Sequence, residues 1–202
     1  MIVKRSIKTE TDNFEIGDVI SFKLTDGEKV KAMAVRKTDE GMLFITVDCL
    51  NEEQPMFKNP GAMGSMQINY FNSDLRHWLN NEVIARFPEE IKSRMIPMRI
   101  GCTDSFDLLR IPTEKEIFGE NPYGKAECDA VKRFKGMKKR RNRIAFDRSE
   151  EGKEKWQWYW LQNRVEDTSP IFAYFALVGG HGFATYHGAS NSFGVRPVFL
   201  LS

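Results

Sequence analysis

The first fifty residues alternate between apolar and polar positions in short runs, a pattern typical of β-strands. The three runs richest in β-branched and aromatic side chains lie at residues 19–24, 25–37 and 41–50. The sequences Asp26-Gly27 and Asp39-Glu40-Gly41 mark the turns between strands, because such sequences favour hairpin turns. The pattern predicts an N-terminal antiparallel β-meander over residues 1–50. Two prolines and two glycines without periodicity then predict a loop at 51–67.

Helical spacing appears in the middle of the chain. In residues 69–87 apolar side chains recur every three or four positions, behind Ser73 or Asn72 as the candidate N-cap. Pro88 then opens a second short helix, with acidic residues in its first turn and basic residues in its last. These signals predict two consecutive helices.

A buried strand and a capped helix are predicted next. Residues 107–112, DLLRIP, are largely apolar, as in a strand inside the core. The following TEKEIFG contains a capping box from Thr113 to Glu116, which starts a short helix that Gly119 ends. Residues 120–155 are polar and highly charged, and short strands with glycine-rich turns follow to the end of the chain.

The last residues, SNSFGVRPVFLLS, combine an apolar strand with Arg196 and Pro197. Proline lacks the N–H group of a strand residue, so the strand is bulged, lies at an edge, or begins its pairing after Pro197. A buried arginine without a partner costs several kcal/mol, so Arg196 must reach either water or a carboxylate.

Composition describes a globular chain but identifies no ligand. The 202 residues are 41% hydrophobic, and 30 basic against 28 acidic side chains give a net charge of +2. This balance is too even to indicate a nucleic-acid or membrane partner. The sequence shows neither a signal peptide nor a membrane span, which favours a cytoplasmic location. Three widely separated cysteines, Cys49, Cys102 and Cys128, favour reduced thiols over a disulfide framework.

One segment departs from this charge balance. Residues 132–143, KRFKGMKKRRNR, contain eight basic side chains in twelve positions. The functional interpretation is a phosphate-binding patch centred on Lys138, Lys139, Arg140 and Arg141. The alternative, which we favour, is a solvated segment that the acidic residues after it neutralise, namely Asp147, Glu150, Glu151 and Glu154.

Tryptophans alternate with other residues in KWQWYWLQ. In a strand, this alternation places Trp156, Trp158 and Trp160 on one face. Exposed indoles stack on sugar rings or bases, whereas buried indoles fill a core shared with the helices. We favour burial, and an indole at the rim is compatible with both interpretations.

A glycine-rich segment at residues 179–193 carries most of the remaining candidate ligand contacts. They are His181, Tyr186, His187, Ser190 and Asn191. A polar, aromatic and glycine-rich composition suits an exposed contact loop, and an ordinary hairpin connection explains it equally well. The three histidines and three cysteines lack metal-binding spacing, and the chain has no nucleophile or phosphate-loop motif. We therefore predict no catalytic residue, metal or cofactor.

Four motifs occur in an order that resembles an uncharacterised domain family of gut bacteria and their phages. They are SDLRHWLN, DLLRIPTEKEIFG, WYWLQNR and GVRPVFLL, and they extend over residues 68–202. The ending also resembles the wider C-type-lectin-like group, which includes the formylglycine-generating enzymes. In that group the last strand pairs beside the early strands, and the loops before it form the ligand face.

The resemblance implies a structural role for Arg196, with Glu116 as its carboxylate partner and Asp107 as second choice. The chain has Gln162-Asn163 where the family usually has arginine and serine or threonine, so a role for that arginine does not carry over. It also lacks the paired active-site cysteines of the formylglycine-generating enzymes, which argues against their chemistry.

Together these features predict an α+β fold, with the β-meander preceding a C-type-lectin-like domain at residues 68–202. The function we expect is non-catalytic recognition of a glycan or protein ligand through the 179–193 loop, with Trp158 contributing. The alternatives are an enzyme of unknown reaction on the same scaffold, because a fold does not determine function, and a nucleic-acid-associated protein.

Overall fold

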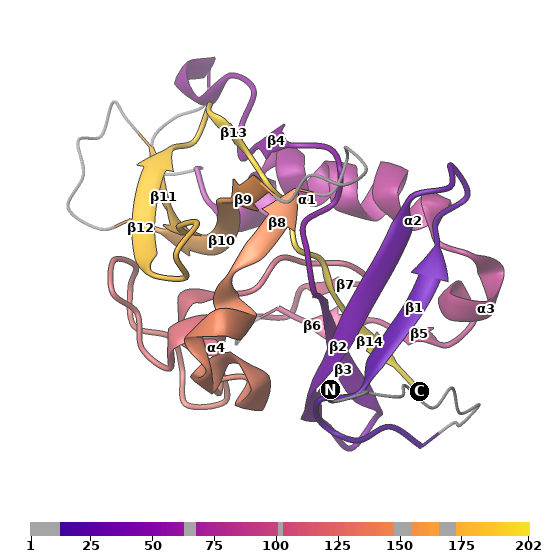
Figure 1. Cartoon of the computed structure of the whole chain (residues 1–202). Helices are drawn as coiled ribbons and strands as arrows, with labels where there is room; N and C mark the ends of the chain where they lie inside the picture. The colour runs from indigo at the N-terminus through magenta and orange to yellow at the C-terminus, as the bar shows by residue number, and fades with distance from the viewer. Residues whose placement is uncertain (1–12, 63–67, 101–102, 148–154, 166–172) are drawn as a thin grey trace, which may run out of the picture.

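A computed structural model describes residues 13–62, 68–100, 103–147, 155–165 and 173–202. The chain combines helices with antiparallel strands. A larger sheet lies at the right of Figure 1 and a three-stranded sheet lies at the left, with short strand pairs and helical segments around them. None of the described helices is both long and apolar enough to cross a bilayer.

The larger sheet has the strand order β1-β2-β3-β14-β5. These strands are β1 (Val19–Lys23), β2 (Lys29–Lys37), β3 (Met42–Thr46), β14 (Val198–Leu201) and β5 (Met95–Ile96). All neighbours pair antiparallel, which confirms the predicted N-terminal meander. Gly27, in the turn after β1, has a φ angle of 93°, a conformation that glycine adopts without steric cost. Strand β14 pairs with both β3 and β5, so early and late segments share one sheet.

The predicted helical region is divided into short segments. They are η3 (Tyr70–Asn72), α1 (Asp74–Trp78), the π-helical turn η4 (Leu79–Val83), α2 (Ile84–Arg86) and α3 (Glu89–Lys92). Ser73 is the N-cap of α1, because its side chain accepts a hydrogen bond from the backbone N–H of Arg76. Pro88 is the N-cap residue of α3. Both helix starts agree with the sequence signals.

Aromatic rings join the helices to the larger sheet. Phe87, at the end of α2, lies 5.3 Å from the Phe22 ring of β1 and 5.6 Å from the Phe199 ring of β14, measured between ring centroids. Phe199 in turn stacks on Phe44 of β3 at 5.7 Å. All four side chains belong to one hydrophobic core.

The remaining described strands form a three-stranded sheet and three two-stranded pairs. That sheet contains β10 (Tyr159–Arg164), β11 (Tyr174–Val178) and β12 (Ala184–Gly188). The strand pairs are β4 (Gln54–Pro55) with β13 (Ser192–Phe193), β8 (Ala145–Asp147) with β9 (Lys155–Gln157), and β6 (Met98–Arg99) with β7 (Phe106–Asp107). The helical segments are η1 (Pro60–Ala62), α4 (Glu114–Phe118), η5 (Lys135–Lys138) and η6 (Arg140–Arg143). Helix α4 has the predicted capping box and ends at Gly119, in a left-handed conformation.

Three local predictions need correction. The expected loop at 179–193 contains the edge strand β12 and the short strand β13. The expected strand at 107–112 is buried over most of its length, but only Asp107 belongs to a strand, while Arg110 forms an isolated bridge to Val198. The tryptophan strand is interrupted at Trp158, between β9 and β10.

The cysteines also differ from expectation. Cys49 is a free thiol in the core, where burial raises its pKa. Cys128 is disulfide-bonded, so the expectation of a reduced thiol is wrong at this position. Cys102 lies outside the described residues.

The closing strand avoids the difficulty posed by its proline. Strand β14 begins at Val198, one residue after Pro197. Ladder hydrogen bonds to the neighbouring strands therefore do not require the missing N–H of Pro197, while its carbonyl accepts a hydrogen bond from Thr46 N at 3.0 Å. Of the three sequence-based alternatives, the structure has the one in which pairing starts after the proline.

Arg196 is buried, with 1% of its surface exposed, but its partners are not the predicted ones. Its Nε and Nη2 both donate to the carbonyl of Thr46, at 2.9 and 2.7 Å. Its Nη1 donates to the carbonyl of Asn142 at 3.3 Å and to the Tyr159 hydroxyl at 3.0 Å, and the guanidinium lies 4.8 Å from the centre of the Tyr159 ring. Oxygen dipoles and an aromatic face thus surround the cation, without a carboxylate among its described hydrogen-bond partners.

The two acids predicted to bind Arg196 bind other arginines. Glu116 accepts two hydrogen bonds from Arg110, at 2.7 and 2.6 Å, and both side chains are buried. Asp107 pairs with Arg76. The predicted ion pair between Arg196 and Glu116 is therefore wrong, because Arg110 lies six positions before Glu116 and reaches it with a bidentate fork.

Replacing Arg196 with lysine should destabilise the fold. Lysine carries its donors on one nitrogen and cannot reproduce the planar fork that reaches Thr46 and Tyr159 together. We expect a loss of roughly 1–3 kcal/mol in the free energy of unfolding, measured with urea, because buried groups lose their hydrogen bonds. As a control, Arg99→Lys changes an arginine whose side chain is 56% exposed, and it should cost less than about 0.5 kcal/mol. Equal effects of the two substitutions would contradict the role of Arg196.

A double-mutant cycle distinguishes the observed partner of Glu116 from the predicted one. Arg110→Met and Glu116→Gln should be coupled by roughly 1–3 kcal/mol, because the two side chains share one buried contact. Arg196→Met and Glu116→Gln share no described partner and should add within about 0.5 kcal/mol. Unfolding free energies of the single and double variants measure both quantities. Coupling of Glu116 to Arg196 instead of Arg110 would refute the observed pairing.

Candidate functional site

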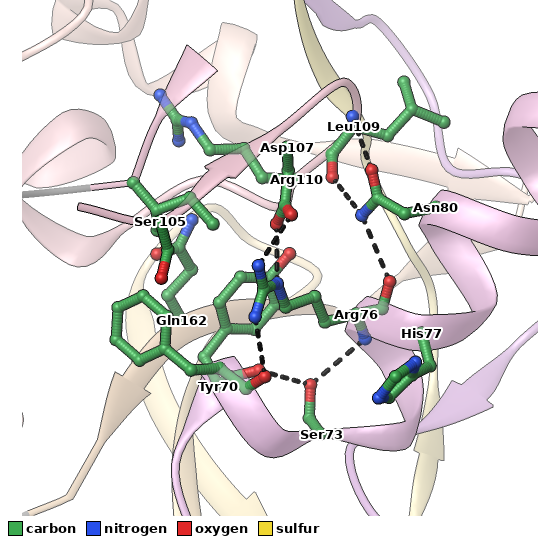
Figure 2. Close-up of polar contacts among 12 residues, drawn as sticks. Tyr70, Ser73, Arg76, His77, Asn80, Ser105, Asp107, Leu109, Arg110 and Gln162 are labelled. Atoms are coloured by element: carbon green, nitrogen blue, oxygen red, sulfur yellow. Dashed lines mark hydrogen bonds and ion pairs between the residues drawn. The ribbon is translucent and has the colours of Figure 1, made fainter. Parts of the chain in front are cut away.

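A polar network connects α1 to the segment around Asp107, and Figure 2 shows it in close-up. Arg76 donates from Nε and Nη2 to the two carboxylate oxygens of Asp107, both at 2.8 Å, and from Nη1 to the carbonyl of Phe71. Asn80, one turn later, donates to the carbonyl of Leu109 and accepts a hydrogen bond from its N–H. These contacts hold the helix against the chain that leads to α4.

The same network accounts for the first motif of the sequence. Ser73 caps the helix and donates to the carbonyl of Tyr70, and Trp78 is buried. The Tyr70 hydroxyl accepts a hydrogen bond from Ile111 N, and burial raises its pKa. Because these polar groups bond to one another, we assign the motif a structural role rather than a catalytic one.

A depression of about 420 Å³ lies beside the tryptophan strand. It is lined by Glu53, Asp147, Lys155, Trp156, Gln157, Trp158, His187 and Phe193, and we call these residues the aromatic depression. Trp156 and Trp158 are 53% and 42% exposed, whereas Trp160 is fully buried. The favoured interpretation, burial in the core, is therefore wrong for Trp156, while the exposed Trp158 is compatible with the indole expected at the rim.

Ring contacts fix the shape of the aromatic depression. Trp158 stacks on Phe193, with ring centroids 5.9 Å apart and an interplanar angle of 13°. The His187 ring lies 5.2 Å from the Phe193 ring, and the His181 ring meets Trp156 edge to face at 4.3 Å, both measured between ring centroids. The exposed rings are thus held by neighbours in defined orientations.

Close backbone packing positions Trp158. Gly194 N donates to the carbonyl of Trp158 at 2.9 Å. A Cβ atom at Gly194 would lie 2.6 Å from Cys49 Sγ and 2.8 Å from Gln157 Cδ, so this crossing requires glycine. Gln157 is itself buried and donates from its amide to Glu53 at 3.0 Å, which holds that carboxylate at the depression.

The structure brings together some of the predicted contact residues. Trp158 and His187 line the aromatic depression, and His181 supports Trp156 at its edge. Ser190 and Asn191 line a neighbouring cavity of about 220 Å³, whose wall also includes His187. The two cavities therefore meet at one histidine.

Tyr186 is separate from this group. It adjoins His187 on β12, but successive strand residues point to opposite faces. Its ring contacts Tyr123 and Tyr174, at centroid distances of 4.9 and 5.8 Å. Tyr186 is exposed, as predicted, yet it does not line the aromatic depression.

Sequence reasoning missed most of the wall. Trp156 was considered but assigned to the core, and its alternation with Trp158 was the available signal. Glu53 and Asp147 are separated by more than ninety positions in sequence and meet only through the fold. No local pattern links them.

The basic stretch at residues 132–143 lies mostly on the surface, and two of its side chains reach into the core. Phe134 and Met137 are buried, and Gly136, Asn142 and Arg143 are partly buried. The exposed basic side chains are Lys132, Lys135, Lys138, Lys139, Arg140 and Arg141, and we call them the basic segment. The predicted phosphate-binding residues are thus accessible. Of the acids expected to neutralise them, Glu150, Glu151 and Glu154 lie outside the described residues.

A third cavity, of about 230 Å³, contains several ionisable groups, as an enzyme site would. Its wall includes Arg36, Arg99, Arg110 and Glu116. Arg110 and Glu116 bind each other, Arg36 donates to Ala130, and Arg99 donates to Thr103. The described residues bring no three potential metal ligands together. Since each arginine has a structural contact, this cavity makes a weaker case for function than the aromatic depression does.

Comparisons with known proteins identify a family but no characterised relative. Neither the curated proteins nor the solved structures gave a match. A family model described as Domain of unknown function (DUF6273) matches residues 40–202, which confirms the expectation of an uncharacterised family. Because this match extends over most of the chain, the protein belongs to that domain family.

Proposed function

We propose that this protein is a non-catalytic recognition module that binds a glycan in the aromatic depression. The observation that carries the proposal is the exposure of two indoles in one depression beside two carboxylates. Aromatic groups that are exposed side by side form an apolar patch, and such patches often mark a binding site. The depression of about 420 Å³ has the size of a small-molecule site.

The chemistry of the wall suits a sugar. The C–H face of a pyranose ring packs on Trp156 or Trp158, which supply apolar area with little loss of conformational freedom. Sugar hydroxyls donate to Glu53 and Asp147 and exchange hydrogen bonds with His187. A few polar groups around an aromatic floor are the usual arrangement of a ligand site.

We also propose that the fold is C-type-lectin-like. Two observations support this assignment: β14 pairs beside the early strand β3, and β12 and β13, which carry His187 and Phe193, come just before it in the chain. A protein ligand is the second candidate, because exposed tryptophans also dominate protein interfaces. The concave shape of the depression favours the smaller ligand.

Removal of one exposed indole tests the proposal. We expect Trp158→Ala to weaken binding of an oligosaccharide at least tenfold, a loss of about 1.4 kcal/mol or more in binding free energy. Glycan arrays would first select the oligosaccharide, and calorimetric titration would then give the affinity. Phe106→Ala, at an aromatic residue that is 56% exposed on β7, provides the matched control and should bind normally. Failure of every oligosaccharide to bind, or normal binding by Trp158→Ala, would refute the proposal.

Two neighbours on β12 test the location of the site. His187→Ala should weaken oligosaccharide binding, whereas Tyr186→Ala should not, because the two side chains lie on opposite faces of the strand. Both positions are exposed, so each substitution should change stability by less than about 1 kcal/mol. Titration calorimetry and urea unfolding measure the two effects. A larger loss of affinity for Tyr186→Ala would move the site to the other face of the sheet.

A further inference from the structure

The basic segment is held so that its charges face solvent. The buried side chains of Phe134 and Met137 anchor η5, and the side chains of Lys135 and Lys138 in η5 and of Arg140 and Arg141 in η6 are exposed. Within the described part of the chain, no ion pair includes any of the six side chains of the basic segment. These six side chains are therefore exposed and have no counter-charge among the described residues.

Nearby groups add to the same positive field. Burial lowers the pKa of Arg143, and the charges of Arg133 and Arg140 lower it further. Like charges thus repel one another along this surface, and an anion placed there would relieve the repulsion. Such a field attracts a polymer that carries repeated negative charges.

One turn contacts both the basic segment and the aromatic depression. This turn comprises residues 179–183. At its start, a Cβ atom placed on Gly180 would lie 3.2 Å from the nearest atom of Trp156 and 3.4 Å from the nearest atom of Trp158. At the other end, the Arg140 guanidinium lies 5.0 Å from the centre of the Phe183 ring. The two surfaces are therefore adjacent, and one extended ligand can contact both.

The charges at the two ends of this surface differ in sign. Among the described residues that line the depression, the acids Glu53 and Asp147 stand against the base Lys155, a formal charge of −1 with His187 neutral. An uncharged ring suits this end, because a negative group there would meet two carboxylates. The basic segment, in contrast, suits a negative group.

We infer that the ligand is an acidic polysaccharide in which uncharged and negatively charged sugars alternate. An uncharged sugar occupies the aromatic depression, and a neighbouring carboxylate or sulfate contacts the basic segment. This inference rests on the proposed glycan-binding function. A nucleic acid fits less well, because it carries a phosphate at every nucleotide and brings one to Glu53 and Asp147.

Calorimetric titration with three probes tests the inference. They are hyaluronan oligosaccharides, uncharged chito-oligosaccharides of the same length, and single-stranded DNA. We expect at least tenfold tighter binding of hyaluronan than of the uncharged oligosaccharide, and a fall in hyaluronan affinity as sodium chloride is raised. Alanine at Lys138, Lys139, Arg140 and Arg141 together should remove this preference.

A matched variant controls for net charge. Alanine at Lys23, Lys29, Lys37 and Lys125 removes the same charge from exposed positions outside the basic segment, and the preference should remain. Equal affinity of the wild-type protein for charged and uncharged oligosaccharides would overturn the inference while leaving glycan binding intact. Salt-sensitive binding of DNA in preference to hyaluronan would overturn it in favour of a nucleic acid. Failure of every glycan to bind, or normal glycan binding by Trp158→Ala, would instead refute the proposed function.

Discussion

The buried guanidinium of Arg196 holds together segments that are distant in sequence. Its hydrogen bonds reach Thr46 at the end of β3, Asn142 in η6 and Tyr159 at the start of β10. A cation removed from water needs oxygen partners, and carbonyl dipoles and a hydroxyl supply them here. Because one planar group binds all three segments, it fixes how the larger sheet, helix η6 and strand β10 are arranged.

The residues around Arg196 extend this arrangement to the surface. Gly194, two positions earlier, allows the chain to pass against Cys49 and Trp158. Strand β13, just before it, carries Phe193, on which Trp158 stacks. Residues 193–201 therefore both close the larger sheet and contribute Phe193 to the wall of the aromatic depression. A single short sequence serves both stability and the candidate site.

Local signals predicted the parts of the fold that depend on local chemistry. The hairpins of the meander, the Ser73 cap and the Thr113 to Glu116 capping box follow from residues close together in sequence, and each occurs in the structure. The partner of Arg196 could not be found in this way, because backbone carbonyls leave no mark on the sequence. The resemblance implies Glu116 as the partner of Arg196, but Glu116 binds Arg110, and a sequence shows which charges are present without showing which of them meet.

The candidate site was predictable only in part, for the same reason. Alternation placed three indoles on one face, but the break between β9 and β10 at Trp158 leaves Trp156 and Trp158 exposed and Trp160 buried. The break coincides with the crossing of Gly194, a contact between segments more than thirty residues apart. About half of each of these two indoles stays exposed, and in the proposed function a bound glycan covers that apolar area. The acids and bases beside them, which also come from distant segments, would then select among glycans.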